Sequence, residues 1–174
     1  MRRGFVVCMG GEMSEIVEYK KGRIHDVVTK TLAKFLDERG WLAELFRSDE
    51  LPLWFRPDMA YISMTVPGVA RGPHEHVDQS DFFCFIGPAN FKIYLWDART
   101  DSPTYGTKQL LYAGADAPLS LLVPPGVVHA YKNISLESGI VFNAPDRLYA
   151  GSGKSRPVDE IRHEDQAGSS FILD

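Results

Sequence analysis

The feature that most constrains the fold of this chain is a series of short apolar segments, each ended by turn-forming glycine or proline residues. In residues 60–66 (AYISMTV) and 91–98 (FKIYLWDA) apolar and polar side chains alternate, while residues 82–86 (FFCFI) are apolar throughout. Alternation with a period of two is typical of β-strands with one buried face. Short strands separated by turns such as residues 124–126 (PPG) therefore predict an all-β sandwich or small barrel.

The two ends of the chain lack this pattern. Residues 1–20 predict an irregular or briefly helical segment, and residues 150–174 are polar, so we expect them to wrap the outside or close over a site. Residues 26–40 (DVVTKTLAKFLDERG) are consistent with a helix or with a strand-rich arm that ends at the turn around Gly40. The length is that of one domain, which we expect to span residues 1–174.

The composition limits the class of function. The formal net charge is −4, which argues against a nucleic-acid partner because binding to a phosphate backbone favours a basic surface. No stretch of about 18 apolar residues is present, so we expect no membrane partner. The two cysteines, Cys8 and Cys84, are too few for a disulfide framework. We expect free thiols in a reducing, cytoplasmic compartment.

Two histidine-bearing segments carry the strongest chemical signal. In RGPHEH, His74 and His76 lie two positions apart and Asp81 follows them, while in VPPGVVH a turn precedes His129. Positions i and i+2 of a strand point to the same side of a sheet, so His74 and His76 can both face a barrel interior. The turn before His129 can bring that residue to the same place. Together the two segments resemble the paired signature of the cupin jelly roll, a double-stranded β-helix.

A narrower resemblance links the chain to the dTDP-4-dehydrorhamnose 3,5-epimerases among the cupins. The segments that carry it are DERGWLAELFR (37–47), VARGPHEH (69–76), DARTDSPTYGT (97–107), VPPGVVHAYKN (123–133) and VDEIRHED (158–165). The resemblance implies a homodimeric cupin without metal or other cofactor that acts on a nucleotide-diphosphate 4-keto-6-deoxy sugar, with dTDP as the expected nucleotide. It also implies proton abstraction α to the keto group, reprotonation, and a role in deoxysugar synthesis for cell-surface polysaccharides.

The same resemblance assigns roles to individual residues. His74 falls on the histidine of the family's RGLH motif and is the expected base, while Asp165, with Glu164 as its rival, falls on the carboxylate that orients it. Arg71 and Arg39 fall on arginines that hold phosphate oxygens, for which a guanidinium fork is suited. The expected substrate-binding residues are Arg39, Arg47, Arg71, His129 and Tyr131.

Three departures from the family pattern bear on the chemistry. Phe142 occupies the place of the family's acid tyrosine and cannot donate a proton, so Tyr149 is the expected acid, with Tyr131 as the other nearby substitute. The segment QSDFFCF offers no counterpart of the family's lysine. His76 is additional and resembles the second histidine of the sugar 3,4-ketoisomerases, so it joins the expected catalytic residues. Inversion at one carbon or a ketoisomerisation needs fewer groups than a double epimerisation.

Two other functions remain compatible with the sequence. In the first, His74, His76, Asp81 and His129 bind a divalent metal, because imidazoles and a carboxylate suit such ions. In the second, the chain binds a sugar nucleotide without catalysis, because it keeps the arginines but lacks the family's tyrosine and lysine. Proton exchange at the sugar and metal content distinguish the three hypotheses.

Overall fold

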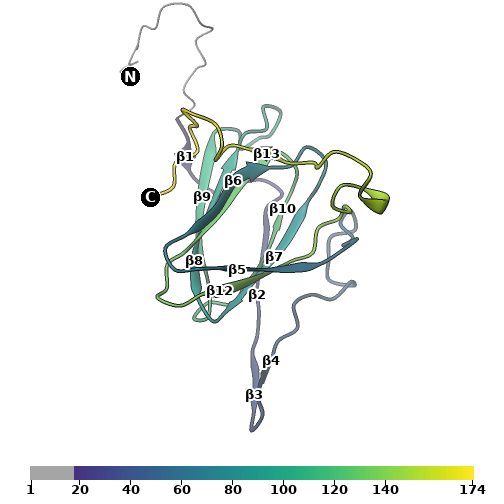
Figure 1. The fold of residues 1–174 in the computed structure, drawn as a ribbon, viewed down its shortest axis with the longest axis vertical. Coiled ribbons are helices and arrows are strands. Elements are labelled where there is room, and N and C mark those ends of the chain that lie inside the picture. Colours follow the sequence, from purple (N-terminus) through teal and green to yellow (C-terminus); the bar gives the residue numbers. More distant parts are fainter. Residues whose placement is uncertain (1–17) are drawn as a thin grey trace, which may run out of the picture.

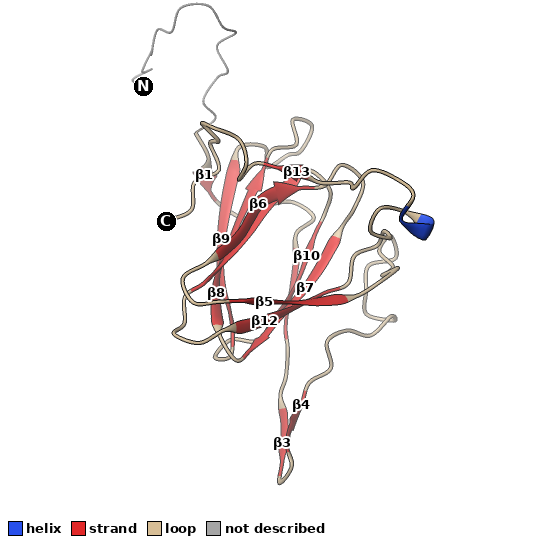
Figure 2. Cartoon of the chain, viewed as in Figure 1, coloured by secondary structure: helices blue, strands red, loops and turns tan. Residues whose placement is uncertain are grey.

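The computed structural model describes residues 18–174, and in this part of the chain two β-sheets face each other (Figures 1 and 2). One sheet has the strand order β1-β9-β8-β11-β6-β13 and the other β2-β10-β7-β12-β5, while β3 pairs only with β4. The strands are β1 (Lys20–Lys21), β2 (Val28–Thr31), β3 (Phe35–Asp37), β4 (Gly40–Leu42), β5 (Tyr61–Thr65), β6 (Ala70–Glu75), β7 (Asp81–Gly87), β8 (Asn90–Asp97), β9 (Thr107–Gly114), β10 (Leu119–Val123), β11 (Val127–Asn133), β12 (Gly139–Asn143) and β13 (Ile161–Arg162). The predicted all-β jelly roll is confirmed.

The core lies between the two sheets and is built from the inward-facing residues of the alternating segments. Phe91, Ile93 and Leu95 of β8 are almost fully buried there, against Phe83 and Phe85 of β7. Burying such a side chain contributes roughly 1.5–3 kcal/mol relative to leaving it exposed. The period-two pattern of the sequence therefore identifies the inner face of β8 correctly.

The outer face of β8 is covered by the end of the chain. Tyr94 and Trp96 are buried as well, and Phe171 and Leu173 pack against them. This covering explains why residues 91–98 are apolar at more positions than a strand with one solvated face requires. The last residues of the polar tail do wrap the outside of the barrel, as predicted.

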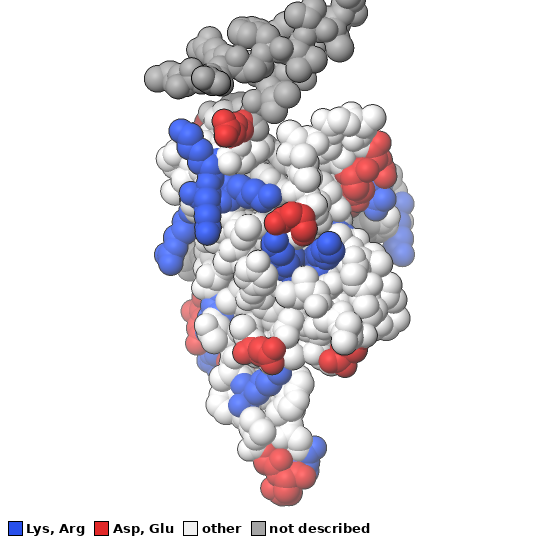
Figure 3. All heavy atoms as spheres, turned by 90° about the vertical axis from the view of Figure 1, so that its left-hand side faces the viewer, with Lys and Arg blue, Asp and Glu red and all other residues white. Residues whose placement is uncertain are grey.

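Residues 26–40 form strands rather than a helix. β2 extends the second sheet beside β10, and β3 and β4 form a hairpin arm that projects from the body (Figures 1 and 3). Gly40 follows the turn with a φ of 128°, a conformation that favours glycine. The arm exposes the large apolar side chains Phe35, Leu36, Trp41 and Leu42.

The tail is predicted to contain no strand, and this prediction is wrong for two residues. Ile161 and Arg162 form β13, which pairs antiparallel with Glu75 and His74 at the edge of β6. A two-residue strand shows no alternation in a sequence, and the open edge of β6 supplies its backbone partners. Apart from a short 3-10 helix at Ser152–Lys154, the remaining tail is irregular, as expected.

Most of the predicted irregular N-terminal segment, including Cys8, falls on residues 1–17 and lies outside the described residues. At its end, Lys20 and Lys21 form β1, which pairs in parallel with β9. Cys84 is buried and free. Within residues 18–174, the helical structure includes nothing long and apolar enough to cross a membrane.

Candidate active site

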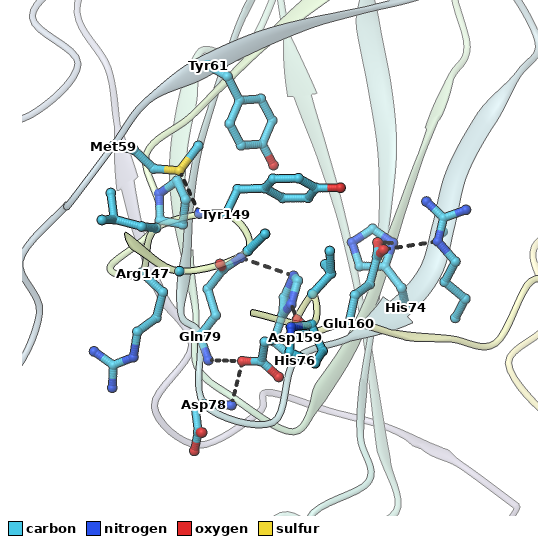
Figure 4. Close-up of a pocket in the computed structure, with 18 of the residues that line it drawn as sticks. Met59, Tyr61, His74, His76, Asp78, Gln79, Arg147, Tyr149, Asp159 and Glu160 are labelled. Carbon is cyan, nitrogen blue, oxygen red and sulfur yellow. Dashed lines mark hydrogen bonds and ion pairs between the residues drawn. The ribbon is translucent and has the colours of Figure 1, made fainter. Parts of the chain in front are cut away.

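A cavity of about 890 Å³ opens between one mouth of the barrel and the tail (Figure 4). Its volume lies within the range of about 300–1,000 Å³ that is typical of small-molecule sites. One wall comes from β5, β6, β7 and β11, and the other comes from residues that follow β12. The polar and charged residues that line it include Tyr61, Arg71, His74, His76, Gln79, Tyr131, Arg147, Tyr149, Arg156, Asp159, Glu160 and Arg162.

Three histidines come together because β6 and β11 pair closely. His74 pairs with His129 across the two strands, with ring centroids 4.5 Å apart, and the ring of His76 lies 5.7 Å from that of His74. Gly72 permits this approach: its φ is 78°, and a Cβ atom there would lie 2.5 Å from the backbone oxygen of His129. Such a position accepts only glycine without displacement of the neighbouring strand. The glycine of RGPHEH therefore has a packing role.

Asp81, the first residue of β7, is a buried carboxylate that faces the histidines. Its Oδ2 atom lies 3.1 Å from His76 Nε2 and 3.3 Å from His129 Nε2. Its Oδ1 atom accepts hydrogen bonds from the side-chain amides of Gln79 and Asn143. Burial alone would raise the pKa of Asp81, but the interactions with His129 and His76 outweigh burial and lower it. Asp81 is therefore an anion at neutral pH.

His76 is held between two oxygen acceptors. Its Nε2 atom faces Asp81, and its Nδ1 atom donates to the backbone carbonyl of Asp159 in the tail. Burial would lower the pKa of His76, but the hydrogen bond and charge of Asp81 and the carbonyl of Asp159 raise it to about 9. The Asp159 carboxylate also accepts backbone N–H groups of residues 77–79, which fastens the tail to this loop. His76 therefore carries a positive charge at neutral pH.

His74 has the opposite protonation state. Burial, and then the electrostatic interactions with His129 and His76, lower its pKa to about 2, so its imidazole is unprotonated at neutral pH. The nearest carboxylate is that of Glu160, whose Oε1 atom lies 3.8 Å from His74 Nδ1. An unprotonated imidazole at a cavity wall can accept a proton or bind a metal.

The predicted partner of His74, Asp165, does not lie beside it. Asp165 is exposed and does not line the cavity; Glu164 lines it, but His74 Nδ1 faces Glu160. The reason is the register of the tail, in which Arg162 of β13 pairs with His74. Residues before β13 therefore point into the cavity, while Asp165 lies beyond the pairing. The carboxylate next to His74 comes from the predicted segment but five positions earlier than expected.

Arg71 and three arginines that follow β12 line the cavity. Arg71 Nε donates to the Thr65 hydroxyl and its Nη2 to a backbone carbonyl, which fixes the guanidinium at the cavity wall. Arg147, Arg156 and Arg162 approach from the opposite wall. Four guanidinium groups around one cavity favour an anionic ligand. Of these four arginines, only Arg71 is predicted from the sequence.

Arg39 and Arg47 are not brought to this cavity within the chain. Arg39 lies at the tip of the arm with its side chain 83% exposed and ion-paired to Asp37. Arg47 follows the arm and pairs with Asp49 at the surface. The prediction that both contact the same substrate as Arg71 is not met in one chain, because the hairpin carries the DERG segment away from the body.

Tyrosines on both walls point into the cavity. Tyr149 and Tyr131 line it as predicted, and the hydroxyl of Tyr131 is hydrogen-bonded to that of Ser63. Tyr61 of β5 was not predicted; its hydroxyl accepts from Asn143, and burial, reinforced by Asp81, raises its pKa to about 12. Burial raises the pKa of Tyr131 as well, so the hydroxyl groups of Tyr61 and Tyr131 hold their protons at neutral pH.

Phe142 faces away from the cavity. It packs against the apolar cluster of Leu32, Phe55 and Phe82 on the other side of its sheet, while its neighbour Asn143 points inward to Asp81. The inward position of β12 is therefore one residue from the place that a gapless alignment predicts for the family's acid.

Besides Arg147, Arg156 and Arg162, the site residues that sequence reasoning missed include Tyr61, Asp159 and Glu160. A signal existed for Tyr61, because it alternates with Ser63 and Thr65, and polar residues on the inner face of a strand mark a wet interior. Asp159 and Glu160 lie in a run of mixed charge that is indistinguishable from a solvated surface. Only the pairing of the tail with β6 reveals them.

The fold and the site define a cupin with a cavity lined by arginines at one mouth of the barrel. The chain belongs to the dTDP-4-dehydrorhamnose 3,5-epimerase family, whose sequence model matches residues 21–166. The resemblance that the sequence motifs carry is therefore confirmed. Membership places the chain in a family of enzymes that act on sugar nucleotides.

Relatives and solved structures agree with this assignment. A probable low-salt glycan biosynthesis epimerase of Haloferax volcanii is 39% identical over 128 residues, 72% of this chain and 81% of that protein. A spore coat polysaccharide biosynthesis protein of Bacillus subtilis is 38% identical over 109 residues, 63% of this chain and 71% of that protein. The fold matches a dTDP sugar isomerase from Desulfovibrio desulfuricans with a TM-score of 0.75 at 20% identity, covering 87% of this chain and 91% of that chain.

Proposed function

We propose that the chain epimerises or isomerises a nucleotide-diphosphate 4-keto-6-deoxy sugar, with dTDP as the favoured nucleotide, and that His74 removes the proton α to the keto group. The observation that carries the proposal is an unprotonated imidazole on the wall of a cavity that also presents arginines and tyrosines. A structure of the same fold, an epimerase from Legionella pneumophila, contains dTDP-4-keto-L-rhamnose. That complex supports the substrate class.

The proposed reaction moves one proton off a carbon and one proton back. His74 takes the proton beside the keto group, the C–H electron pair forms the enolate double bond, and the charge moves to the keto oxygen. The positive charge of His76 stabilises the enolate in place of the family's lysine. Tyr149, with Tyr61 beside it, then protonates the other face of the carbon and regains a proton from His74 through water (Figure 4).

Substrate binding should make His74 more basic. A pKa of about 2 keeps His74 unprotonated but weakly basic, because burial and neighbouring positive charge both oppose protonation. An anionic diphosphate at the cavity rim adds negative charge, and Glu160 already lies 3.8 Å away. Both favour the protonated form. We therefore expect enolisation to depend on the nucleotide part of the substrate.

The arginines of both walls suit the diphosphate. One wall presents the guanidinium group of Arg71 on β6, and the other presents those of Arg147 and Arg156, which follow β12. A guanidinium binds two phosphate oxygens at once. Arg162 is less free, because its Nε donates to Glu160. We expect the diphosphate to lie between Arg71 and the tail, with the sugar directed toward His74.

We also propose a homodimer in which the hairpin arm packs on a second copy of the chain. The arm exposes Leu36 and Leu42 by 79% and 66%, and the outer face of β5 exposes Ile62 and Met64 by 68% and 62%. Apolar side chains on a projecting hairpin need a covering surface, and a second copy supplies the β5 face. The dimer would return Arg39 to a ligand site, because the arm tip would then lie against the partner. Light scattering on Leu36→Glu, expected to be monomeric, tests this arrangement.

Proton exchange at the sugar tests the proposed reaction. The protein is incubated in deuterium oxide with dTDP-4-keto-6-deoxyglucose and a chelator, and the sugar protons are followed by NMR. We expect loss of the C3 or C5 proton signal in the wild type and a fall of about 10²–10⁴-fold in His74→Asn. The matched control is His25→Asn, which removes a half-exposed histidine outside the cavity lining.

The pattern of exchange sorts the reactions. Exchange at both carbons indicates a double epimerase, and exchange at one carbon indicates a single epimerase or a ketoisomerase. Equal rates in His74→Asn and the wild type would rule out His74 as the base. Binding of dTDP without any proton exchange would indicate that the chain binds sugar nucleotides without catalysing a reaction.

A further inference from the structure

We propose that His74, His76, Asp81 and His129 form a binding site for one divalent transition-metal ion of the zinc type at the inner end of the cavity. These four residues each offer one ligand atom, and the four atoms lie within 4.8 Å of one another. His74 and His129 lie on β6 and β11, His76 directly follows β6 and Asp81 begins β7, so the barrel carries all four ligands, and the tail carbonyl of Asp159 orients His76. Binding of the ion does not depend on the proposed reaction.

The spacing of the ligand atoms fits such an ion. Metal–nitrogen and metal–oxygen bonds of about 2.0–2.2 Å place the corners of a tetrahedron about 3.3 Å apart. Asp81 Oδ2 lies 3.1 Å from His76 Nε2 and 3.3 Å from His129 Nε2. Asp81 therefore already stands at tetrahedral spacing from two of the histidines, and all four ligand atoms lie within 4.8 Å of one another.

The outer nitrogens of His76 and His129 have the partners that metal ligands require. His129 Nδ1 donates to the Val127 carbonyl at 3.0 Å, and His76 Nδ1 donates to the Asp159 carbonyl. A carbonyl can only accept, so each ring carries its proton on Nδ1 and turns Nε2 inward. Ligating histidines usually hold their other nitrogen in this way, on a carbonyl or a carboxylate.

His129 distinguishes a metal from an ordinary hydrogen-bond network. Its side chain is 4% exposed, and within residues 18–174 its Nε2 atom has no hydrogen-bond partner, although Asp81 Oδ2 lies 3.3 Å away. If Nε2 is unprotonated, its lone pair faces the Asp81 carboxylate, which is repulsive. If Nε2 is protonated, its proton points away from the Asp81 oxygen that should accept it. A cation bonds to both atoms and removes the conflict. One carboxylate and three neutral imidazoles also leave a single positive charge to bury, which is less costly than two.

Metal binding and enolisation should exclude each other. The ion would replace the proton of His76 and occupy the ring nitrogen of His74 that otherwise accepts the substrate proton. This consequence, unlike the binding itself, rests on the proposed function. Zinc would therefore inhibit the exchange reaction at one equivalent per chain, and a chelator would restore it.

Titration of the chelator-stripped protein with Co²⁺ tests the site without substrate. We expect visible ligand-field absorption that saturates at one ion per chain, and its displacement by Zn²⁺ in calorimetry. His129→Gln and His76→Gln should each weaken Co²⁺ binding by at least about tenfold. His25→Asn and His163→Gln, which remove histidines outside the cluster, should bind as the wild type does. Circular dichroism and thermal melts confirm that each variant is folded.

Three outcomes would overturn the site: no saturable absorption in the folded wild type, binding that survives both glutamine variants, or binding that the two control variants abolish. The exchange reaction is scored separately, in chelator. Proton exchange in chelator together with no Co²⁺ binding would contradict the proposed metal site and support the proposed function. Stoichiometric Co²⁺ binding with no proton exchange in chelator would support the metal site and contradict the proposed function.

Discussion

Two buried carboxylates show how one chemical group serves different purposes in this barrel. Asp81 and Asp97 are 1% and 0% exposed, and the pKa of each is lowered although burial raises it. Asp97 accepts hydrogen bonds from Arg99, Ser102 and Thr104 at 2.8, 2.6 and 2.6 Å. All three partners lie within seven residues of it, in the same turn.

The difference lies in the partners. Arg99 stays protonated at any ordinary pH and the hydroxyls do not ionise, so the turn around Asp97 has one state. Asp81 instead faces two imidazoles, His76 just after β6 and His129 on β11, and imidazoles gain and lose protons or bind metals. Burial of a charge therefore marks a functional site only where the groups that compensate it can change state.

Replacing each aspartate by asparagine gives the largest contrast. Asp81→Asn leaves His76 buried without its counter-charge, so we expect the free energy of unfolding to fall by about 3–5 kcal/mol. We also expect proton exchange per folded molecule to fall by at least about 10²-fold. Urea unfolding and NMR exchange measure the two effects.

Asp97→Asn is the matched control, because it removes a carboxylate of equal burial outside the cavity. It should destabilise the fold and leave the exchange rate of the folded fraction unchanged. Loss of exchange in Asp97→Asn would mean that the turn also serves the reaction, and the contrast between the two carboxylates would fail.

Two glycines allow the histidine cluster and the Asp97 turn to be compared through backbone substitutions. Gly72 and Gly126 have similar φ values of 78° and 73°. An added Cβ would lie 2.5 Å from the backbone oxygen of His129 at Gly72 but 2.7 Å from the flexible side chain of Arg99 at Gly126. We expect Gly126→Ala to cost about 1–2 kcal/mol of stability for the left-handed backbone alone.

Gly72→Ala should cost more, by about another 1–3 kcal/mol, because strands β6 and β11 must move apart. Urea unfolding gives the two costs, and histidine ring signals in NMR report the movement. Only the variant at Gly72 should shift the signals of His74 and His129. Equal costs and unshifted signals would show that the two strands tolerate a side chain between them.

The sequence was sufficient to predict the strands of the barrel and the histidine cluster. Period-two patterns identify elements such as β8, and His74 and His129 lie opposite each other on paired strands with His76 two positions beyond His74, so local rules place them. The sequence does not decide between a helix and strands for residues 26–40, because this segment contains good helix formers. Pairing of β2 with β10 decides the matter, and that contact is remote in sequence.

The tail half of the site could not be predicted in the same way. Glu160 rather than Asp165 reaches His74 because of the register of β13, which two residues in an irregular segment do not encode locally. Likewise, the inward turn of Asn143 instead of Phe142 depends on a register irregularity between β12 and β7. Arg39 shows a third limit, because its role depends on what covers the arm.

The stability of the Asp97 turn should depend on pH in a defined direction. The folded pKa of Asp97 is about 2, below its ordinary value of 3.8, because of the hydrogen bonds and charge that outweigh burial. Ionised Asp97 therefore stabilises the fold by about 2 kcal/mol above roughly pH 5, and this is lost as the pH falls through 2. The difference in unfolding free energy between wild type and Asp97→Asn should shrink to roughly half by pH 3. A difference that is constant from pH 7 to pH 3 would contradict the assignment.

The smallest effect separates the hydroxyl partners of Asp97 from its arginine. Thr104→Val removes the 2.6 Å hydrogen bond to Asp97 while keeping the shape of the side chain, and should cost about 1 kcal/mol. Thr100→Val, at an exposed position of the same turn, should change stability by less than about 0.5 kcal/mol. A double-mutant cycle with Asp97→Asn isolates the contact, because the part of the cost of Thr104→Val that comes from the carboxylate disappears while the lost hydrogen bond from the His25 N–H remains. A coupling near zero would mean that Thr104 adds nothing to the hold of Arg99 and Ser102 on Asp97, and the threonine would then lie outside the network.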